Sequence, residues 1–157
     1  MDLRRRPPRR WNEELSGIKW LPRLIDKTIA ALAGRLGGYL YGQSPIDRDL
    51  LDALGIGYRS FAKIVANSAT DDDVFRHLFV NAPEGIERAR AWSEALRKDR
   101  GTMLFIIDID DGYLPQWYWK ALRAPANLAS NALMAAVKAL FPSRALDADN
   151  QDWAKLG

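Results

Sequence analysis

The segment LPRLIDKTIAALAGRLGG, residues 21–38, decides the class of the fold. Its apolar side chains recur at the spacing of an amphipathic helix, and Pro22 stands near the start, where the missing N–H of proline costs nothing. The pair Gly37-Gly38 predicts that this helix ends near Leu36. A helical wheel predicts a core-facing stripe that consists of Ile25, Ile29, Leu32 and Leu36.

Helix start signals recur along the rest of the chain. Ser44 followed by Pro45 predicts a helix that ends at Gly55. Thr70 predicts another, because the three aspartates after it oppose the helix dipole. Further helices are expected over residues 58–67, 83–97 and 127–141. Strand alternation is nearly absent, so helix should dominate and strand should be negligible.

The segment MLFIIDI, residues 103–109, is open to two interpretations. Its β-branched residues favour a strand, but a single strand has no partner with which to pair, and we therefore expect a buried helix. The whole chain is then predicted to be all-α, with about six or seven helices in a single compact domain over residues 21–157. Residues 1–20 are expected to form an extended arm packed on that domain, because Pro7-Pro8 disfavours helix.

The first helix carries three charged side chains away from its core-facing stripe: Arg23, Asp26 and Lys27. A solvated face is the usual interpretation of such charges. The small residues Ala30 and Gly34 lie on the same side, however, and would let another segment approach closely. We therefore expect Arg23 and Lys27 to be mostly buried, with Asp26 hydrogen-bonded to at least one of them. Such a cluster is either a structural network or a ligand site.

Polar side chains that follow this helix complete a candidate pocket: Tyr39, Tyr41 and Asp47. Lys27 is the candidate base or nucleophile, with Asp26 or Asp47 as the proton acceptor. Arg23 is the candidate anion clamp, and the two tyrosines and Asp47 are candidate ligand-binding residues. The competing interpretation places the tyrosines at the edge of the core and makes Asp47 only a helix cap; it is stronger for Asp47.

Positive charge is concentrated in the arm. The net charge is +3, to which residues 1–10 contribute +4 and the other 147 residues contribute −1. Arginine clusters bind nucleic-acid phosphates without sequence preference, and the candidates for such contacts are Arg4, Arg5, Arg6, Arg9 and Arg10. We favour the competing view, in which the arm is docked and its arginines pair with carboxylates of the body.

Composition excludes several kinds of chemistry. The chain has no cysteine, which excludes disulfides and Cys-ligated metals. It has a single histidine, His77, which disfavours a Ser-His-Asp triad. We therefore expect no metal and no cofactor. No apolar run is long enough to cross a bilayer, and no signal peptide is visible, so no membrane association is expected and the predicted location is the cytoplasm.

A second carboxylate cluster ends in glycine: Asp108, Asp110, Asp111 and Gly112. An apolar run followed by Asp-x-Asp resembles the nucleophile motif of haloacid-dehalogenase phosphatases, but Gly112 replaces the last motif residue and the alternating strands of that fold are missing. The spacing of a calcium loop also fails, so the cluster is assigned no role. The aromatic trio Trp117-Tyr118-Trp119 is expected to pack in a core or an interface.

A family resemblance is carried by Leu3, Pro7-Pro8-Arg9, Gly17, Leu21-Pro22-Arg23, Asp26-Lys27, Gly34, Tyr39, Tyr41, Pro45, Asp47 and Gly55. These residues resemble the DUF5069 domains, a family of small bacterial proteins of unknown function. The resemblance implies a compact cytosolic protein whose arm belongs to the domain, and it brings no known activity. Many members are expected to have Cys where this chain has Ser44, so no cysteine nucleophile is carried over.

Two functions follow from these observations. The leading expectation is a small-molecule-binding or enzymatic helical domain with a polar pocket around Arg23, Asp26 and Lys27, which suits an anionic ligand. The alternative is a non-enzymatic module that binds nucleic acid or protein through the Arg-rich arm. The choice between the two functions depends on whether Arg23, Asp26 and Lys27 are buried together or face solvent.

Overall fold

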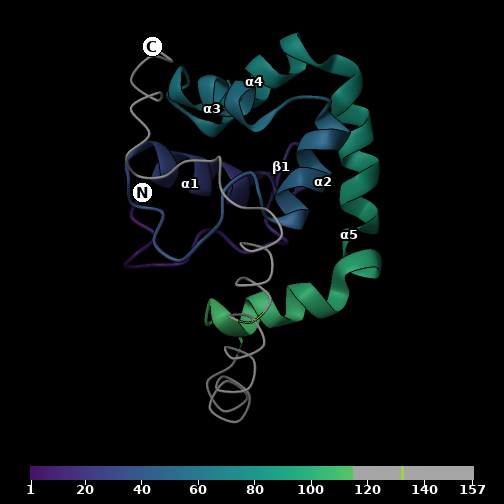
Figure 1. The fold of residues 1–157 in the computed structure, drawn as a ribbon. Coiled ribbons are helices and arrows are strands. Elements are labelled where there is room, and N and C mark those ends of the chain that lie inside the picture. Colours follow the sequence, from purple (N-terminus) through teal and green to yellow (C-terminus); the bar gives the residue numbers. More distant parts are fainter. Residues whose placement is uncertain (115–131, 133–157) are drawn as a thin grey trace. The chain divides into compact units, whose positions relative to one another are not determined.

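The computed structural model describes residues 1–114 and Ala132, which fall into two units, residues 1–94 and a second that begins at Ala95. Figure 1 shows the order of the elements in each unit. The aromatic trio at residues 117–119 and, apart from Ala132, the predicted helix over residues 127–141 lie outside the described residues. No helix in the described part of the chain is long and apolar enough to cross a membrane.

The first unit begins with a small antiparallel hairpin. Strand β1, Glu14–Leu15, pairs with strand β2, Ile18–Lys19. Ser16 and Gly17 between them both have positive φ, 51° and 82°, as a tight two-residue hairpin turn requires. The sequence predicted only an extended arm here, so the hairpin is an addition to the expected all-α fold.

Helix α1, Leu21–Leu32, ends four residues before the predicted end at Leu36. Gly34 has a φ of +63°, its N–H donates to the carbonyl of Ala31, and the N–H of Arg35 donates to the carbonyl of Ala30. This is the hydrogen-bond pattern of a Schellman cap. Gly34 therefore terminates the helix, a role for which its positive φ suits it, and the predicted stop at Gly37-Gly38 was wrong.

Helix α1 is buried on more of its surface than the predicted stripe. Leu24, Ile25 and Ala30 are buried, which agrees with packing on two sides. Ile29, a predicted core residue, is 37% exposed, and Gly34 is exposed with open space around it. The face that carries Arg23, Asp26 and Lys27 is instead buried. The helix thus turns much of its charged side inward.

Three helices complete most of the first unit. Helix α2, Pro45–Leu54, ends at Gly55; helix α3 is Tyr58–Ala66; helix α4, Asp71–Asn81, starts with a capping box between Thr70 and Asp73. Helix α1 packs on α3, and α3 packs on α4. The fully buried side chains include Ile18, Leu21, Leu24, Ile25, Ile46, Leu50, Leu54, Phe61, Leu78 and Ile86.

Helix α5, Pro83–Asp110, is continuous over 28 residues, where the sequence predicted two separate helices. Met103–Ile109 is therefore helical, as expected. In the first unit α5 passes so close to α2 that a Cβ on Gly85 would lie 2.2 Å from the carbonyl oxygen of Leu54. In the second unit Leu104 and Ile109 are buried. The described residues are mostly helical and contain five helices, against six or seven predicted for the whole chain.

Candidate functional site

A buried ion pair joins α1 to α2. The Lys27 ammonium lies 2.6 Å from Oδ1 and 2.5 Å from Oδ2 of Asp47. Only 4% of the Lys27 side chain and none of the Asp47 side chain is exposed. In a medium that screens charge poorly, this attraction is much stronger than it would be in water. Lys27 and Asp47 therefore form the centre of the candidate site.

Two further N–H groups bind the Asp47 carboxylate. The indole N–H of Trp20 donates to Oδ1 at 2.8 Å, and the backbone N–H of Gly42 donates to Oδ2 at 3.2 Å. Both oxygens of Asp47 are thus held by the ammonium and by a second donor. The interpretation of Asp47 as only a helix cap was wrong, because its carboxylate binds groups outside its own helix.

Trp20 and Gly42 hold unusual backbone conformations next to this carboxylate. Trp20, the residue before α1, has a φ of 69°, which costs a side-chain-bearing residue about 1–3 kcal/mol. Gly42 has a φ of 68°, and a Cβ there would lie 2.8 Å from the Cβ of Tyr58. The backbone therefore has a positive φ at both residues that donate to Asp47, Trp20 through its side chain and Gly42 through its backbone N–H. The sequence analysis assigned neither residue to the site.

The two predicted ligand-binding tyrosines lie in different places, Tyr41 near the Asp47 carboxylate and Tyr39 near the Arg23 guanidinium. Tyr41 is buried and its hydroxyl donates to the carbonyl of Tyr58 at 2.7 Å. Burial raises the pKa of the Tyr41 phenol well above its ordinary value, and the charge of Asp47 acts in the same direction. Tyr39 is half-buried and belongs to the largely exposed segment that follows α1.

The Arg23 guanidinium lies near two aromatic faces. Its Cζ atom is 5.1 Å from the centre of the Trp20 ring and 5.7 Å from that of Tyr39. Lys27 Nζ is 5.6 Å from the Trp20 ring, so one indole contacts both cations. Distances of this size allow cation–π attraction. Trp20 thus connects Arg23 to the Lys27–Asp47 pair.

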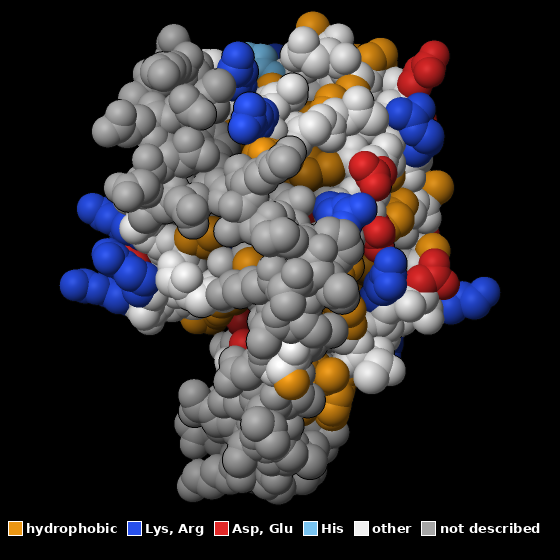
Figure 2. Space-filling model, in the orientation of Figure 1, with side chains coloured by type: hydrophobic (Ala, Val, Ile, Leu, Met, Phe, Trp, Pro, Cys, Tyr) orange, Lys and Arg blue, Asp and Glu red, His pale blue; other side chains and the backbone are white. Residues whose placement is uncertain are grey.

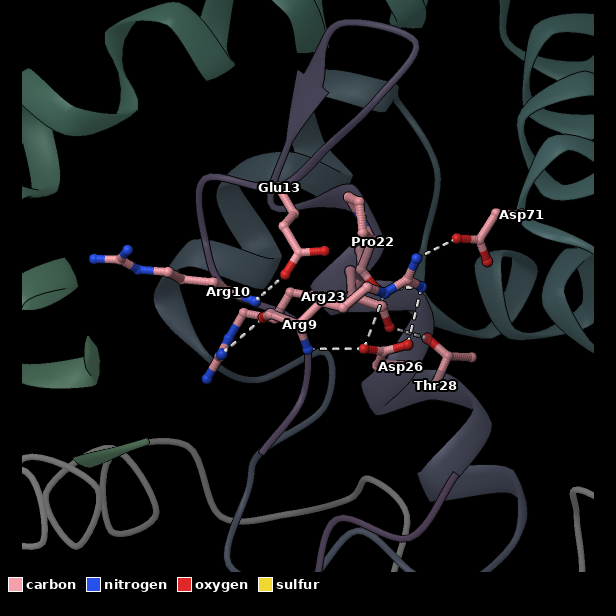
Figure 3. A network of polar contacts seen from close by, with 9 residues as sticks. Arg9, Arg10, Glu13, Pro22, Arg23, Asp26, Thr28 and Asp71 are labelled. Carbon is pink, nitrogen blue, oxygen red and sulfur yellow. Dashed lines mark hydrogen bonds and ion pairs between the residues drawn. The ribbon is translucent and has the colours of Figure 1, made fainter. Parts of the chain in front are cut away.

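Arg9 of the N-terminal arm binds Asp26 as a two-pronged clamp (Figure 3). Its Nε and terminal nitrogen lie 3.1 and 2.9 Å from the two Asp26 oxygens, and its backbone N–H donates to the same carboxylate at 2.8 Å. The guanidinium also binds the carbonyl of Pro22 and the carboxylate of Asp71 on α4. Arg9 therefore fastens the arm to both α1 and α4.

The backbone of Arg9 also receives a hydrogen bond, at 3.1 Å, from the guanidinium of Arg23 to its carbonyl oxygen. Burial opposes the charged form of Arg9, but its hydrogen bonds to Asp71 and Asp26 outweigh this effect and raise its pKa above the ordinary value. Arg9 is thus held as a cation. The arm and the charged side of α1 form one connected network.

The cations and carboxylates are paired differently from the prediction. Arg23, Asp26 and Lys27 are all buried, as expected, but Asp26 binds Arg9, and Lys27 binds Asp47. The sequence analysis predicted a hydrogen bond between Asp26 and Arg23 or Lys27, its neighbours on α1. Ion pairs between distant segments give no periodic signal along the chain, so this pairing could be read only from the structure.

The carboxylates after the apolar run lie at the end of α5 and not in a strand–loop motif. Gly112, with a φ of 78°, closes the helix, because its N–H donates to Ile109 and the N–H of Tyr113 donates to the carbonyl of Asp108. Asp108 itself is buried. In the described residues, no group of three or more His, Asp or Glu side chains is arranged to hold a metal ion.

One known protein family matches the part of the chain that contains this network. A family model described as a domain of unknown function (DUF5069) matches residues 5–104. The chain belongs to the DUF5069 family. The DUF5069 match includes Arg9, α1 and α2, and it ends before Asp108. No curated protein and no solved structure matches the chain significantly.

Proposed function

We propose that this DUF5069 domain binds a small anionic molecule next to the Lys27–Asp47 pair. The observation that carries the proposal is the burial of this pair between two helices. Burying two charges costs several kcal/mol of solvation for each, and apolar residues of similar size often stabilise a fold as well or better. A buried ion pair is therefore weak support for a purely stabilising role, and clustered buried charges are common at functional sites.

In this proposal Arg23 binds the anion. A planar guanidinium can donate two parallel hydrogen bonds to a carboxylate or phosphate, and the aromatic rings of Trp20 and Tyr39 limit its movement. Tyr39 is half-buried and follows residues 33–38, of which all but Leu36 are exposed, so this side of the network borders on solvent.

Lys27 and Asp47 supply the acid–base chemistry of the proposed site. Among the described residues, Asp47 is the carboxylate within hydrogen-bond distance of the Lys27 ammonium, and this supports Asp47 rather than Asp26 as the proton acceptor. Asp26 is instead proposed to position the site, because it holds Arg9, whose carbonyl accepts from Arg23. Tyr41, kept neutral by burial, adds a hydroxyl beside the pair.

The test measures stabilisation by inorganic phosphate, acetate and citrate. A ligand that binds only the folded state raises the melting temperature with its concentration. We expect at least one of these anions to do so in the wild type, and Arg23→Gln to remove the effect. Arg59→Gln is the matched control, because Arg59 is exposed on α3 and belongs neither to the site nor to the arm. The proposal is refuted if the anions stabilise both variants equally. It is also refuted if they stabilise neither the variants nor the wild type.

A second variant keeps the test valid if Arg23→Gln does not fold. Lys27→Met combined with Asp47→Asn removes both charges of the pair and keeps an amide oxygen that can accept from Trp20. Removing the charges together leaves neither one unpaired, so the variant should remain folded. We expect it to lose stabilisation by the anion. If it is stabilised like the wild type, the pair is only a structural link.

A further inference from the structure

Four of the five arginines of the arm lie in two different environments. Arg9 is turned inward, where it binds Asp26 and Asp71. Three consecutive arginines, Arg4, Arg5 and Arg6, are exposed, and 86% of the Arg5 side chain is accessible to solvent. Of these four, one fastens the arm to the body and three face solvent; the fifth, Arg10, is half-buried.

A defined turn presents the three exposed arginines. The N–H of Arg5 donates to the carbonyl of Asp2 at 3.3 Å, and the Asp2 carboxylate accepts from the backbone and the guanidinium of Arg4 at 2.9–3.1 Å. The hydrogen bond from Arg4 is the largest effect that lowers the pKa of Asp2 below its ordinary value. Asp2 therefore stays ionised and keeps the turn closed over the physiological range of pH.

The turn is anchored at both ends. Leu3 is buried and its N–H donates to the carbonyl of Arg35 at 3.0 Å, while Pro8 is buried directly before the Arg9 clamp. A surface that is already ordered loses less entropy when a partner binds. The three arginines differ in this respect from those of a free basic tail, which the partner would have to order on binding.

A fourth exposed arginine lies on the neighbouring segment. Arg35 is exposed and its carbonyl holds Leu3, so residues 2–6 and Arg35 carry four arginines against one aspartate. We refer to these residues as the arginine turn. In Figure 2, Lys and Arg side chains project at the left edge, the side on which Figure 1 places the N-terminus.

We propose that the arginine turn binds the phosphodiester backbone of a nucleic acid. The guanidinium fork matches the oxygens of a phosphate, and the regularly spaced phosphates of a nucleic acid can engage several arginines at once. A membrane surface fits less well, because Leu3 and Pro8, the apolar residues on either side of the three arginines, are buried and offer nothing to insert into a bilayer. The inference does not depend on the proposed small-molecule site.

The size of the effect follows from counterion release. Asp2 offsets one arginine, so about three phosphate contacts are expected, and log affinity for duplex DNA should fall with log salt with a slope of about −2.7. Between 50 and 200 mM salt the affinity should then fall about 40-fold. Binding should therefore be clear at low salt and weak at physiological salt.

The experiment is a fluorescence-anisotropy titration of the full chain against a short labelled duplex DNA and a labelled single-stranded RNA over a salt series. Arg5→Gln combined with Arg6→Gln removes two exposed charges from the arginine turn. Arg59→Gln combined with Lys63→Gln removes two exposed charges from α3 and is the control. We expect the first variant to lower the slope for duplex DNA by about 1.8, and the control to leave it unchanged.

Three results would overturn the inference. The first is an absence of binding to both nucleic acids at low salt. The second is an equal loss of affinity in the two double variants, which would show a diffuse charge effect. The third is binding to vesicles that contain phosphatidylserine, lost with Arg5 and Arg6, under conditions in which neither nucleic acid binds. Unchanged melting temperatures of both variants would show that neither change acts through the fold.

Discussion

Lys27 on α1 and Asp47 on α2 are 20 residues apart in the chain and place their charged atoms 2.6 Å apart in the interior. The glycine-containing segment between the two helices has to turn back for this contact to form. It does so with Gly42, whose N–H binds the same carboxylate. The pair, the turn and the indole of Trp20 thus form a single unit, in which the loss of one member leaves a buried charge or donor without its partner.

Asp47→Ala should be strongly destabilising. It removes the Asp47 carboxylate from the Lys27 ammonium, which is only 4% exposed, and breaking a buried ion pair in this way typically costs about 3–5 kcal/mol. Denaturant unfolding measures the effect. Asp52→Ala on the same helix is the control, since Asp52 is exposed, and should change stability by less than about 0.5 kcal/mol. Similar values for both variants would show that the pair contributes nothing specific.

Removing either partner of the Arg9–Asp26 clamp should have unequal effects. Arg9→Ala leaves the Asp26 carboxylate, 4% exposed, without the guanidinium, and should cost about 3 kcal/mol. Asp26→Ala leaves Arg9 partly exposed and still bound to Asp71, so the cost should be smaller, about 1–2 kcal/mol. Unfolding free energies of the two variants test this order. The reverse order would mean that Asp71 has no part in holding the arm.

Tyr41 should make the fold sensitive to alkaline pH. Because the pKa of its phenol is raised in the folded state, the phenol favours folding at pH values below its ordinary pKa of 10, and this contribution is lost as the pH rises above that value. The unfolding free energy should therefore fall less steeply above pH 10 in Tyr41→Phe than in the wild type. If Tyr41 ionises near pH 10 in the folded wild type, seen as phenolate absorbance that Tyr41→Phe lacks, the explanation fails.

Gly85→Ala tests the close approach of α5 to α2. The new methyl group would lie 2.2 Å from the Leu54 carbonyl oxygen, so the helices would have to separate, at a cost of at least about 1–3 kcal/mol. Gly101→Ala in the same helix has open space around the new methyl and should stabilise by about 0.5–1 kcal/mol. Melting temperatures that move in the same direction for both changes would contradict this packing.

Local signals in the sequence were sufficient for most of the helices. The Thr70 cap, the Pro45 start and the stop at Gly55 are determined within a few residues, and all three lie where they were predicted. The end of α1 was misplaced because Gly34, Gly37 and Gly38 offer three stops, and the choice depends on which glycine can close a Schellman cap. The hairpin was missed because each strand has only two residues, too few for alternation to be seen.

The candidate site was predicted in its members but not in its connections. Arg23, Asp26 and Lys27 were expected to be buried because small residues accompanied them on α1, and they are buried. Their partners Arg9, Trp20 and Asp47 come from other segments, and helical periodicity contains no information about which distant charge will meet which. Trp20 could have been assigned to the site from the sequence. It directly precedes the helix that begins with Leu21-Pro22, so its large side chain has to lie near the first turn of that helix.

The contact between Arg9 and Asp71, 62 residues apart, has a consequence for synthesis on the ribosome. At about 5–20 residues per second, roughly 3–12 s pass between the addition of the two residues. Asp26 follows Arg9 by only 17 residues, so the clamp closes in two stages on the growing chain. The arm is made first, yet it reaches its final position only after the start of α4 has been translated.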